Sequence, residues 1–209
     1  MANNIIGIER LGALGVLRQG TRHYTIRNGA DLPDSMGVKI QKWINIKTED
    51  LNEQDIIYID KKHYNEDVCI TKGDIVFTTF PTLNTQNIAY IDKTLEEYIY
   101  GETMYIFRAN RDIDNEYIFA ILDSGLYNRF INRYIKKFKV SSKFKLTHEM
   151  ILNISIPIFD EATQKEIIQE HRKLLEENRK SKDLEKKIKE RKDNYNKQLF
   201  QQIQNSINI

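Results

Sequence analysis

Residues 160–204 contain neither glycine nor proline, and this feature limits the folds open to the chain more than any other. The segment reads as one continuous charged helix of about 44 residues, roughly 65 Å long. One face carries an apolar stripe made of Ile167, Ile168, Leu174, Leu175, Leu184, Ile188, Tyr195, Leu199 and Ile203. The rest of the chain is too small to cover this stripe, so the sequence predicts a partner helix from a second copy or another chain. A solitary solvated helix held by i,i+4 ion pairs is the alternative.

The remaining sequence predicts a head domain over 1–158, followed by the helix over 159–209. Short apolar or alternating runs typical of strands occur at 37–46, 55–60, 75–80, 87–92, 104–108 and 154–156, and residues 5–11 and 13–18 are predicted to be short strands or turns. Residues 114–137 change to helical spacing, with a break near Ser124 and Gly125. Strands followed by helices indicate an α+β fold with a mixed or antiparallel sheet. The run Ile156-Pro157-Ile158 joins this head to the helix.

Several protein classes are disfavoured. No run of 18 apolar residues is present, and the first four residues do not open a signal peptide. The single cysteine, Cys69, cannot form an internal disulfide and is expected to be a small buried apolar residue. These features favour a cytoplasmic protein.

Enzyme motifs are mostly missing. The sequence has no GxGxxG, GxxxxGK[ST], GxSxG or HExxH, and its three prolines are never adjacent, unlike the Pro-Pro-aromatic motif of amino methyltransferases. Pro33-Asp34 followed by Asp60-Lys61-Lys62 has the outline of a PD-(D/E)xK nuclease, in which carboxylates hold Mg²⁺. That outline is short and common by chance, so turn and strand-end residues are the preferred interpretation. We expect a chain that binds and does not catalyse, with no metal or cofactor of its own.

Charge is segregated along the head. The net charge is only +2, but basic residues gather at 18–27, at Arg108 with Arg111, and most densely from Arg129 to Lys145, a run with no acidic residue. Such clusters can present a basic face to phosphates without a high overall pI. Plain solvated surface charge is the alternative.

The order of motifs resembles one target-recognition domain plus one spacer helix of a type I restriction–modification specificity subunit. The similar segments are Ile8-Glu9-Arg10-Leu11-Gly12 through Gly20, Ile40 to Ile46, Ile70-Thr71-Lys72-Gly73-Asp74-Ile75-Val76-Phe77-Thr78, Asn115 to Ser124, Leu146 to Ile154, and Ile156-Pro157-Ile158 with Gln164-Lys165-Glu166-Ile167. Phe159 stands where the family often has a second proline, and Ala162-Thr163 where it often has a glutamate pair. These departures affect the start of the helix.

The resemblance implies a half-subunit, because family members usually carry two recognition domains and two helices. Two copies would pair through an antiparallel coiled coil, with Ile167, Leu174, Ile188, Tyr195 and Leu199 in the dimer interface. The implied partners are double-stranded DNA with an inverted bipartite target, DNA adenine methyltransferase subunits that carry S-adenosylmethionine, and a restriction subunit. Pairing with another specificity chain is a second possibility within the family. Outside it, the competing interpretation is a coiled-coil scaffold or regulator whose head binds protein.

Candidate DNA contacts follow from side-chain chemistry and placement in loops or on the polar side of a strand. They form four groups: Arg18, Gln19, Thr21, Arg22 and His23; Lys39, Gln41 and Lys42; Thr79, Thr82, Asn84 and Gln86; and Lys139, Ser141, Ser142 and Lys143. Base contacts are expected mainly from the first and third groups. The lysine-rich fourth group is expected to contact phosphates.

Overall fold

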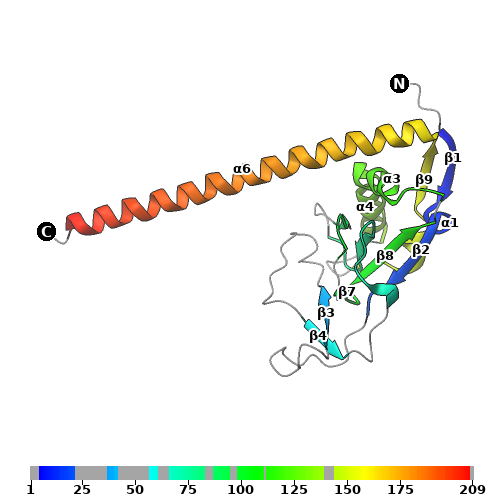
Figure 1. Ribbon diagram of the computed structural model, residues 1–209, viewed down its shortest axis with the longest axis horizontal. Helices are drawn as coiled ribbons and strands as arrows, with labels where there is room; N and C mark the ends of the chain where they lie inside the picture. Colours follow the sequence, from blue (N-terminus) through cyan, green and yellow to red (C-terminus); the bar gives the residue numbers. More distant parts are fainter. Residues whose placement is uncertain are drawn as a thin grey trace. The chain divides into compact units, whose positions relative to one another are not determined.

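The structure is a computed structural model that describes residues 5–21, 37–41, 57–60, 66–82, 87–94, 98–110, 112–138 and 144–207 (Figure 1). For 37–41, 57–60, 66, 137–138 and 198–207 it describes the backbone alone. The chain divides into two compact units, Met1–Gln164, which we call the head, and Lys165–Ile209. The α+β class with a long C-terminal helix is confirmed, and whether the two parts serve as DNA-binding and dimerisation domains stays a prediction.

The elements follow one another as β1 (Ile5–Arg10), α1 (Leu11–Leu14), β2 (Gly15–Gln19), β3 (Gly37–Gln41), β4 (Ile57–Asp60), η4 (Glu66–Val68), β5 (Ile75–Thr78), β6 (Ile88–Tyr90), β7 (Tyr98–Tyr100), β8 (Met104–Ala109), α3 (Asn115–Ile121), η5 (Leu122–Leu126), α4 (Tyr127–Phe138), α5 (His148–Leu152), β9 (Ser155–Phe159) and α6 (Glu161–Ile207). Residues 11–14, at the junction of the two predicted strand or turn elements, form α1, a single helical turn. Strand β7 was not predicted.

The described strands form three sheets, in the orders β1-β9, β2-β8-β5-β6 and β4-β3-β7. All pairings are antiparallel except β3 with β7, which is parallel, so the predicted mixed sheet is confirmed. Strand β5 lies inside the four-stranded sheet and is buried along its whole length, which explains its continuous Ile-Val-Phe run.

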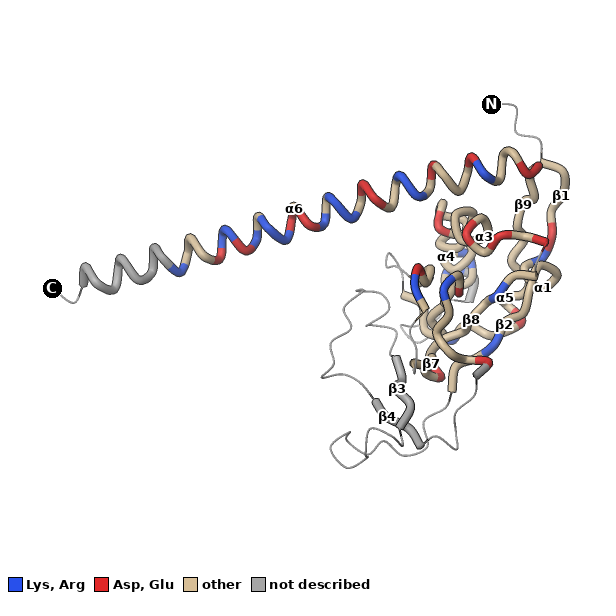
Figure 2. The backbone as a smooth tube through the Cα atoms, in the orientation of Figure 1, with Lys and Arg blue, Asp and Glu red and all other residues tan. Residues whose placement is uncertain are grey.

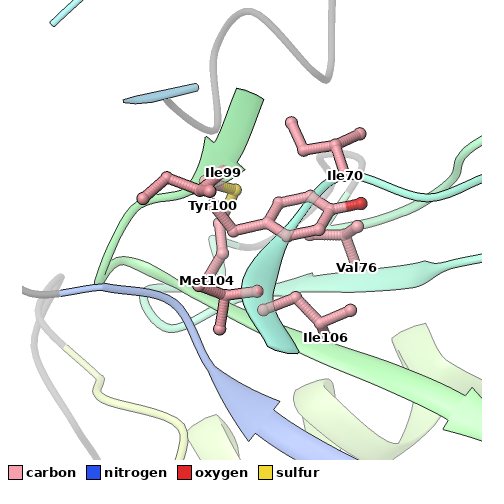
Figure 3. Packing of buried hydrophobic residues seen from close by; sticks show 7 residues of the cluster. Ile70, Val76, Ile99, Tyr100, Met104 and Ile106 are labelled. Carbon is pink, nitrogen blue, oxygen red and sulfur yellow. The ribbon is translucent and has the colours of Figure 1, made fainter. Parts of the chain in front are cut away.

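The core lies on both faces of the four-stranded sheet. On one face, Val76 and Ile106 pack into a cluster with Val68, Ile70, Ile99, Tyr100 and Met104 (Figure 3). On the other face, the ring of Phe77 contacts that of Tyr127 from α4, with centroids 5.3 Å apart. Both faces of β5 are therefore covered.

Glycine and aspartate set the helix boundaries. Gly125, at φ 99°, adopts a conformation that other residues rarely accept, and it turns the chain between α3 and α4 at the predicted break. Asp160 caps α6 because its Oδ1 accepts from the Thr163 N–H at 2.9 Å, a bond that lowers the pKa of this carboxyl. Helix α6 contains 47 residues, about 70 Å in length.

Candidate nucleic-acid interface

Chain segments far apart in the sequence meet at one edge of the four-stranded sheet, which we call the loop edge (residues 19–21, 79–82 and 101–103). Here β2 and β5 end and β6 and β8 begin, since Gln19 pairs with Tyr105, Thr78 with Met104 and Phe77 with Ile88. Strand β7 also ends here, because Tyr100 precedes the turn at 101–103. The sheet thus gathers several connections at one place, as expected of a binding site carried by loops.

Main-chain hydrogen bonds hold the loop edge together. The N–H of Thr21 donates to Tyr100 O at 2.8 Å, and the N–H of Thr79 donates to Thr103 O at 2.8 Å. A Cβ at Gly20 would collide with the carbonyl oxygen of Gly101, so only glycine allows this approach. The positions of the loop ends depend on backbone atoms.

Three members of the first predicted group lie at the loop edge or just before it. Gln19 is exposed, and its Nε2 donates to Glu102 O at 2.9 Å. Thr21 is partly exposed and forms a bridge with Gly101. Arg18 forms an ion pair with Asp67 at 2.7 Å (Nη1–Oδ1) on the surface. Arg22 and His23 follow Thr21 in the chain and lie outside the described residues.

The second group borders the same edge through β3. Gln41, the last residue of β3, pairs with Tyr100, and Lys39 pairs with Tyr98. The side chains of Lys39 and Gln41, and all of Lys42, lie outside the described residues. The backbone therefore brings the end of β3 beside the end of β7.

The third group is split. Thr82 is exposed, and its N–H donates to Asn87 Oδ1 at 2.9 Å. Thr79 has only 1% of its surface exposed, and its Oγ1 has no hydrogen-bond partner among the described residues. Thr79 therefore supports the edge from inside. Asn84 and Gln86 lie outside the described residues.

The fourth group, Lys139, Ser141, Ser142 and Lys143, also lies outside the described residues. The chain leaves α4 just before this group and returns to the loop edge just after it, where the N–H of Leu146 donates to Thr79 O at 2.8 Å. The described residues on either side of the fourth group are thus the end of α4 and a segment bonded to the loop edge.

A buried polar network at the opposite end of β5 and β8, connected to the loop edge through Tyr100, went unrecognised in the sequence. Asp74, 1% exposed, accepts hydrogen bonds from Arg108 Nε at 2.6 Å, Arg108 Nη2 at 3.0 Å, Tyr100 Oη at 2.9 Å and the Thr71 N–H at 2.9 Å. The Asp74 hydrogen bonds raise the pKa of Arg108. Burial, followed by the charge of Asp74, raises the pKa of Tyr100 well above its ordinary value.

This network corrects one interpretation of the basic clusters. The sequence groups Arg108 with Arg111 as surface charge, but the Arg108 guanidinium is turned inward onto Asp74 and Cys69 O (2.6 Å). The Lys72-Gly73-Asp74 motif therefore ties β5 to β7 and β8, with Gly73 at φ 93° in the turn before Asp74. Cys69 itself is a partly buried cysteine, outside any disulfide, that packs against the cluster.

The nuclease outline gains no support from the described residues. Asp34 and Lys62 lie outside them, and of Asp60 only the backbone, at the end of β4, is described. Among described side chains, no three His, Cys, Asp or Glu residues are grouped as a metal site. No described helix is long and apolar enough to cross a bilayer.

The predicted dimerisation stripe lies on α6. The exposed fractions are 52% for Leu174, 66% for Ile188 and 62% for Tyr195. Ile167 is partly exposed, and the side chain of Leu199 lies outside the described part of the helix. Large apolar side chains at this level of exposure leave an apolar surface that a partner helix can cover.

Comparison with known proteins yields one family and several solved structures. The profile of the type I restriction modification DNA specificity domain matches residues 28–201. No curated protein has significant sequence similarity to the chain.

Two of the similar structures are an HsdS subunit from Thermoanaerobacter tengcongensis (TM-score 0.54) and a chain from a structure of the type I R-M system (TM-score 0.56). Each is 21% identical, with 85% of this chain and 44% of the other aligned. The type IIG restriction endonuclease BpuSI is also similar (TM-score 0.53, 11% identity, 81% of this chain and 27% of the other). At these identities the likeness concerns the fold, and the chain spans less than half the length of each of these structures.

Proposed function

Because this chain belongs to the type I restriction modification DNA specificity family, we propose that its head is a target-recognition domain that reads double-stranded DNA. The observation that carries the proposal is that described members of three predicted groups lie at or beside one edge of the sheet: Gln19 and Thr21, the backbone of Gln41, and Thr82. Their sequence positions range from 19 to 82, so only the fold brings them together. Polar side chains on loops held by a rigid sheet suit base recognition.

In this proposal, some residues at the loop edge contact bases and others contact phosphates. The base edges in a groove are contacted by Gln19, Thr21 and Thr82 and by their neighbours in the chain, Arg22, His23, Asn84 and Gln86. The phosphates are bound by Lys139, Ser141, Ser142 and Lys143, and also by Lys39, Gln41 and Lys42 at the end of β3. Arg18 reaches DNA by exchanging its exposed ion pair with Asp67 for a phosphate, an exchange that costs little because exposed pairs are weak.

We propose further that a second copy supplies a second head. Antiparallel pairing of two α6 helices would bury the stripe that contains Leu174, Ile188 and Tyr195, all of which are exposed in the single chain. Two-fold symmetry would then give identical half-sites in inverted orientation, separated by the length of the helices. Catalysis belongs to DNA adenine methyltransferase subunits that bind this dimer and hold S-adenosylmethionine, and a restriction subunit completes the assembly.

The DNA-reading proposal is tested by selection from a random double-stranded library with the full chain together with its methyltransferase subunit. We expect enrichment of two inverted half-sites at a fixed spacing. Enrichment of a single half-site would retain DNA reading and refute the symmetric dimer. If no sequence is enriched and the head captures protein alone, the scaffold interpretation replaces ours.

Dimerisation is tested separately by light scattering of the full chain, whose monomer mass is 24.7 kDa. We expect twice that mass, and a return to the monomer mass for Ile188→Glu, because a charge in the middle of an apolar seam disfavours pairing. Lys187→Glu, one residue away in the helix, is the matched control, and it should remain a dimer. An unsubstituted chain at the monomer mass would refute the symmetric arrangement.

A further inference from the structure

The charge of the head is concentrated in one segment. Residues 127–147 contain seven Lys or Arg and no Asp or Glu, whereas the other residues of 1–164 contain 13 basic and 22 acidic residues. Outside this segment the head is therefore acidic and would repel a polyanion. If the head binds DNA, as proposed above, most of the electrostatic attraction must come from residues 127–147.

Helix α4 forms the first half of this segment and has two different faces. Tyr127 and Ile131 are both 1% exposed and anchor one face in the core. Arg129, Arg133 and Lys136 are exposed, and their i, i+4, i+7 spacing puts them along one line on the opposite face. Figure 2 shows the basic positions of α4 in blue, with no acidic position among them.

No carboxylate among the described residues neutralises the three cations. Arg133 and Lys136 form no hydrogen bond or ion pair with any described residue, and Arg129 donates from Nε only to the Gly125 carbonyl at 3.3 Å. The other arginines near the sheet differ, since Arg18 pairs with Asp67 and Arg108 with Asp74. Three cations on one helix face, with no carboxylate partner in the described part of the chain, make a line of positive charge suited to an anionic ligand.

The position of α4 connects this line to the loop edge. The aromatic ring of Tyr134 in α4 contacts that of Phe130 (centroids 4.8 Å apart) and that of Phe144 (6.5 Å). Phe144 lies two residues before Leu146, whose N–H donates to Thr79 O. The C-terminal half of α4 therefore lies against the chain segment that bonds to the loop edge. From Arg129 to Lys136 the helix advances about 10.5 Å, close to three base-pair steps of DNA.

We propose that Arg129, Arg133 and Lys136 form a phosphate-binding ridge that holds the DNA backbone next to the bases read at the loop edge. None of the three was among the individual contacts expected from sequence, although all belong to the basic run from Arg129 to Lys145. The ridge has no access to base identity, so it adds affinity and register equally on every DNA sequence. Its anchoring residues, Tyr127 and Ile131, fix the ridge relative to the sheet that carries the loops.

The ridge is tested with the full chain and a random-sequence DNA duplex, by fluorescence anisotropy between 50 and 200 mM KCl. The variant Arg129→Gln/Arg133→Gln/Lys136→Gln should lower the slope of log K against log salt by about one for each phosphate that the variant no longer neutralises. The affinity should fall on the order of tenfold or more at 100 mM KCl. Arg10→Gln is the matched control because Arg10 is an exposed arginine that donates to Asn153 Oδ1, and it should leave both quantities unchanged.

The outcomes separate this inference from the proposed function. An unchanged slope and affinity in the triple variant, with DNA binding by the unsubstituted chain, would overturn the ridge alone. A weaker affinity for a selected target with an unchanged affinity for random duplex would also overturn it, because it would indicate base contacts. If the unsubstituted chain binds no duplex at all, the proposed function itself fails. Circular dichroism checks that the variant keeps its helix content.

Discussion

Replacement of Asp74 should destabilise the head more than any other single loss of a carboxylate among the described residues of the head. Its two oxygens accept hydrogen bonds from Arg108 Nε and Nη2, from the Tyr100 hydroxyl and from the Thr71 N–H. Asp74→Ala removes four accepted hydrogen bonds and leaves a cation that is 30% exposed without its counter-ion. In that variant, the shortest hydrogen bond left to Arg108 Nη2 is the one to Cys69 O, at 2.6 Å.

The magnitude follows from burial. Removal of one partner from a buried ion pair costs about 3–5 kcal/mol of unfolding free energy. Because the Arg108 guanidinium can reach some water, we expect the lower end, about 3 kcal/mol. Asp74→Asn keeps the volume and one acceptor oxygen, so about 2 kcal/mol is expected. Against a typical domain stability of about 5–15 kcal/mol, either change is large.

Urea denaturation followed by tryptophan fluorescence and circular dichroism measures these changes in stability. Asp67→Asn is the matched control, since Asp67 pairs with Arg18 on the surface with 57% of its side chain exposed, and a change of about 0–1 kcal/mol is expected. Adding Arg108→Met to Asp74→Ala should cost less than the sum of the two single changes. A destabilisation below about 0.5 kcal/mol for Asp74→Asn would refute the assignment of this network as a buried ionic anchor.

Two further predictions concern buried groups. The Tyr127 hydroxyl is buried with no partner among the described residues, so Tyr127→Phe should leave stability unchanged or raise it by up to about 1 kcal/mol. Burial also raises the pKa of Tyr127, so the folded protein keeps the phenolic proton at a pH where the unfolded chain loses it. The free energy of unfolding should therefore fall as the pH rises above 10.0, and it should fall less steeply in Tyr127→Phe. Urea unfolding midpoints at pH 9 and pH 10.5 measure this difference. Gly20→Ala should destabilise the head by about 1–3 kcal/mol and weaken DNA binding, because the added Cβ would collide with the Gly101 carbonyl. An unfolding temperature equal to that of the wild type would contradict this reasoning. Gly7→Ala is the control, because a Cβ at Gly7 meets nothing within 4 Å.

Local signals predicted much of the fold. The absence of glycine and proline predicted α6, and Gly125 predicted the break between α3 and α4, because both depend on intrinsic backbone preferences. Strand β7 has only three residues, Tyr98–Tyr100, and its pairing with β3 depends on residues about 60 positions away in the sequence. Such pairing leaves no local pattern.

The candidate site was predictable in outline only. That the polar loop segments contact DNA stays a prediction, and the sheet brings the described ends of several of these segments to one edge. Charge counting could not tell Arg108 from Arg133, since the first is held by Asp74, 34 positions earlier, and the second has no partner among the described residues. Thr79 was predicted as a surface contact by its place after β5, yet backbone bonds to Thr103 and Leu146 place it inside. Which residues face DNA depends on these non-local contacts.

The main-chain bonds at the loop edge have a consequence for how such a protein can change. The N–H of Thr21 bonds to Tyr100 O, that of Thr79 to Thr103 O, and that of Leu146 to Thr79 O, so the loop ends are fixed by atoms that almost every amino acid possesses. Because the anchors are backbone atoms, substitutions in the segments between them do not remove the anchoring bonds. Protein engineers could exchange residues 22–36 or 139–143 as cassettes, and natural variation could drift through new specificities on an unchanged scaffold.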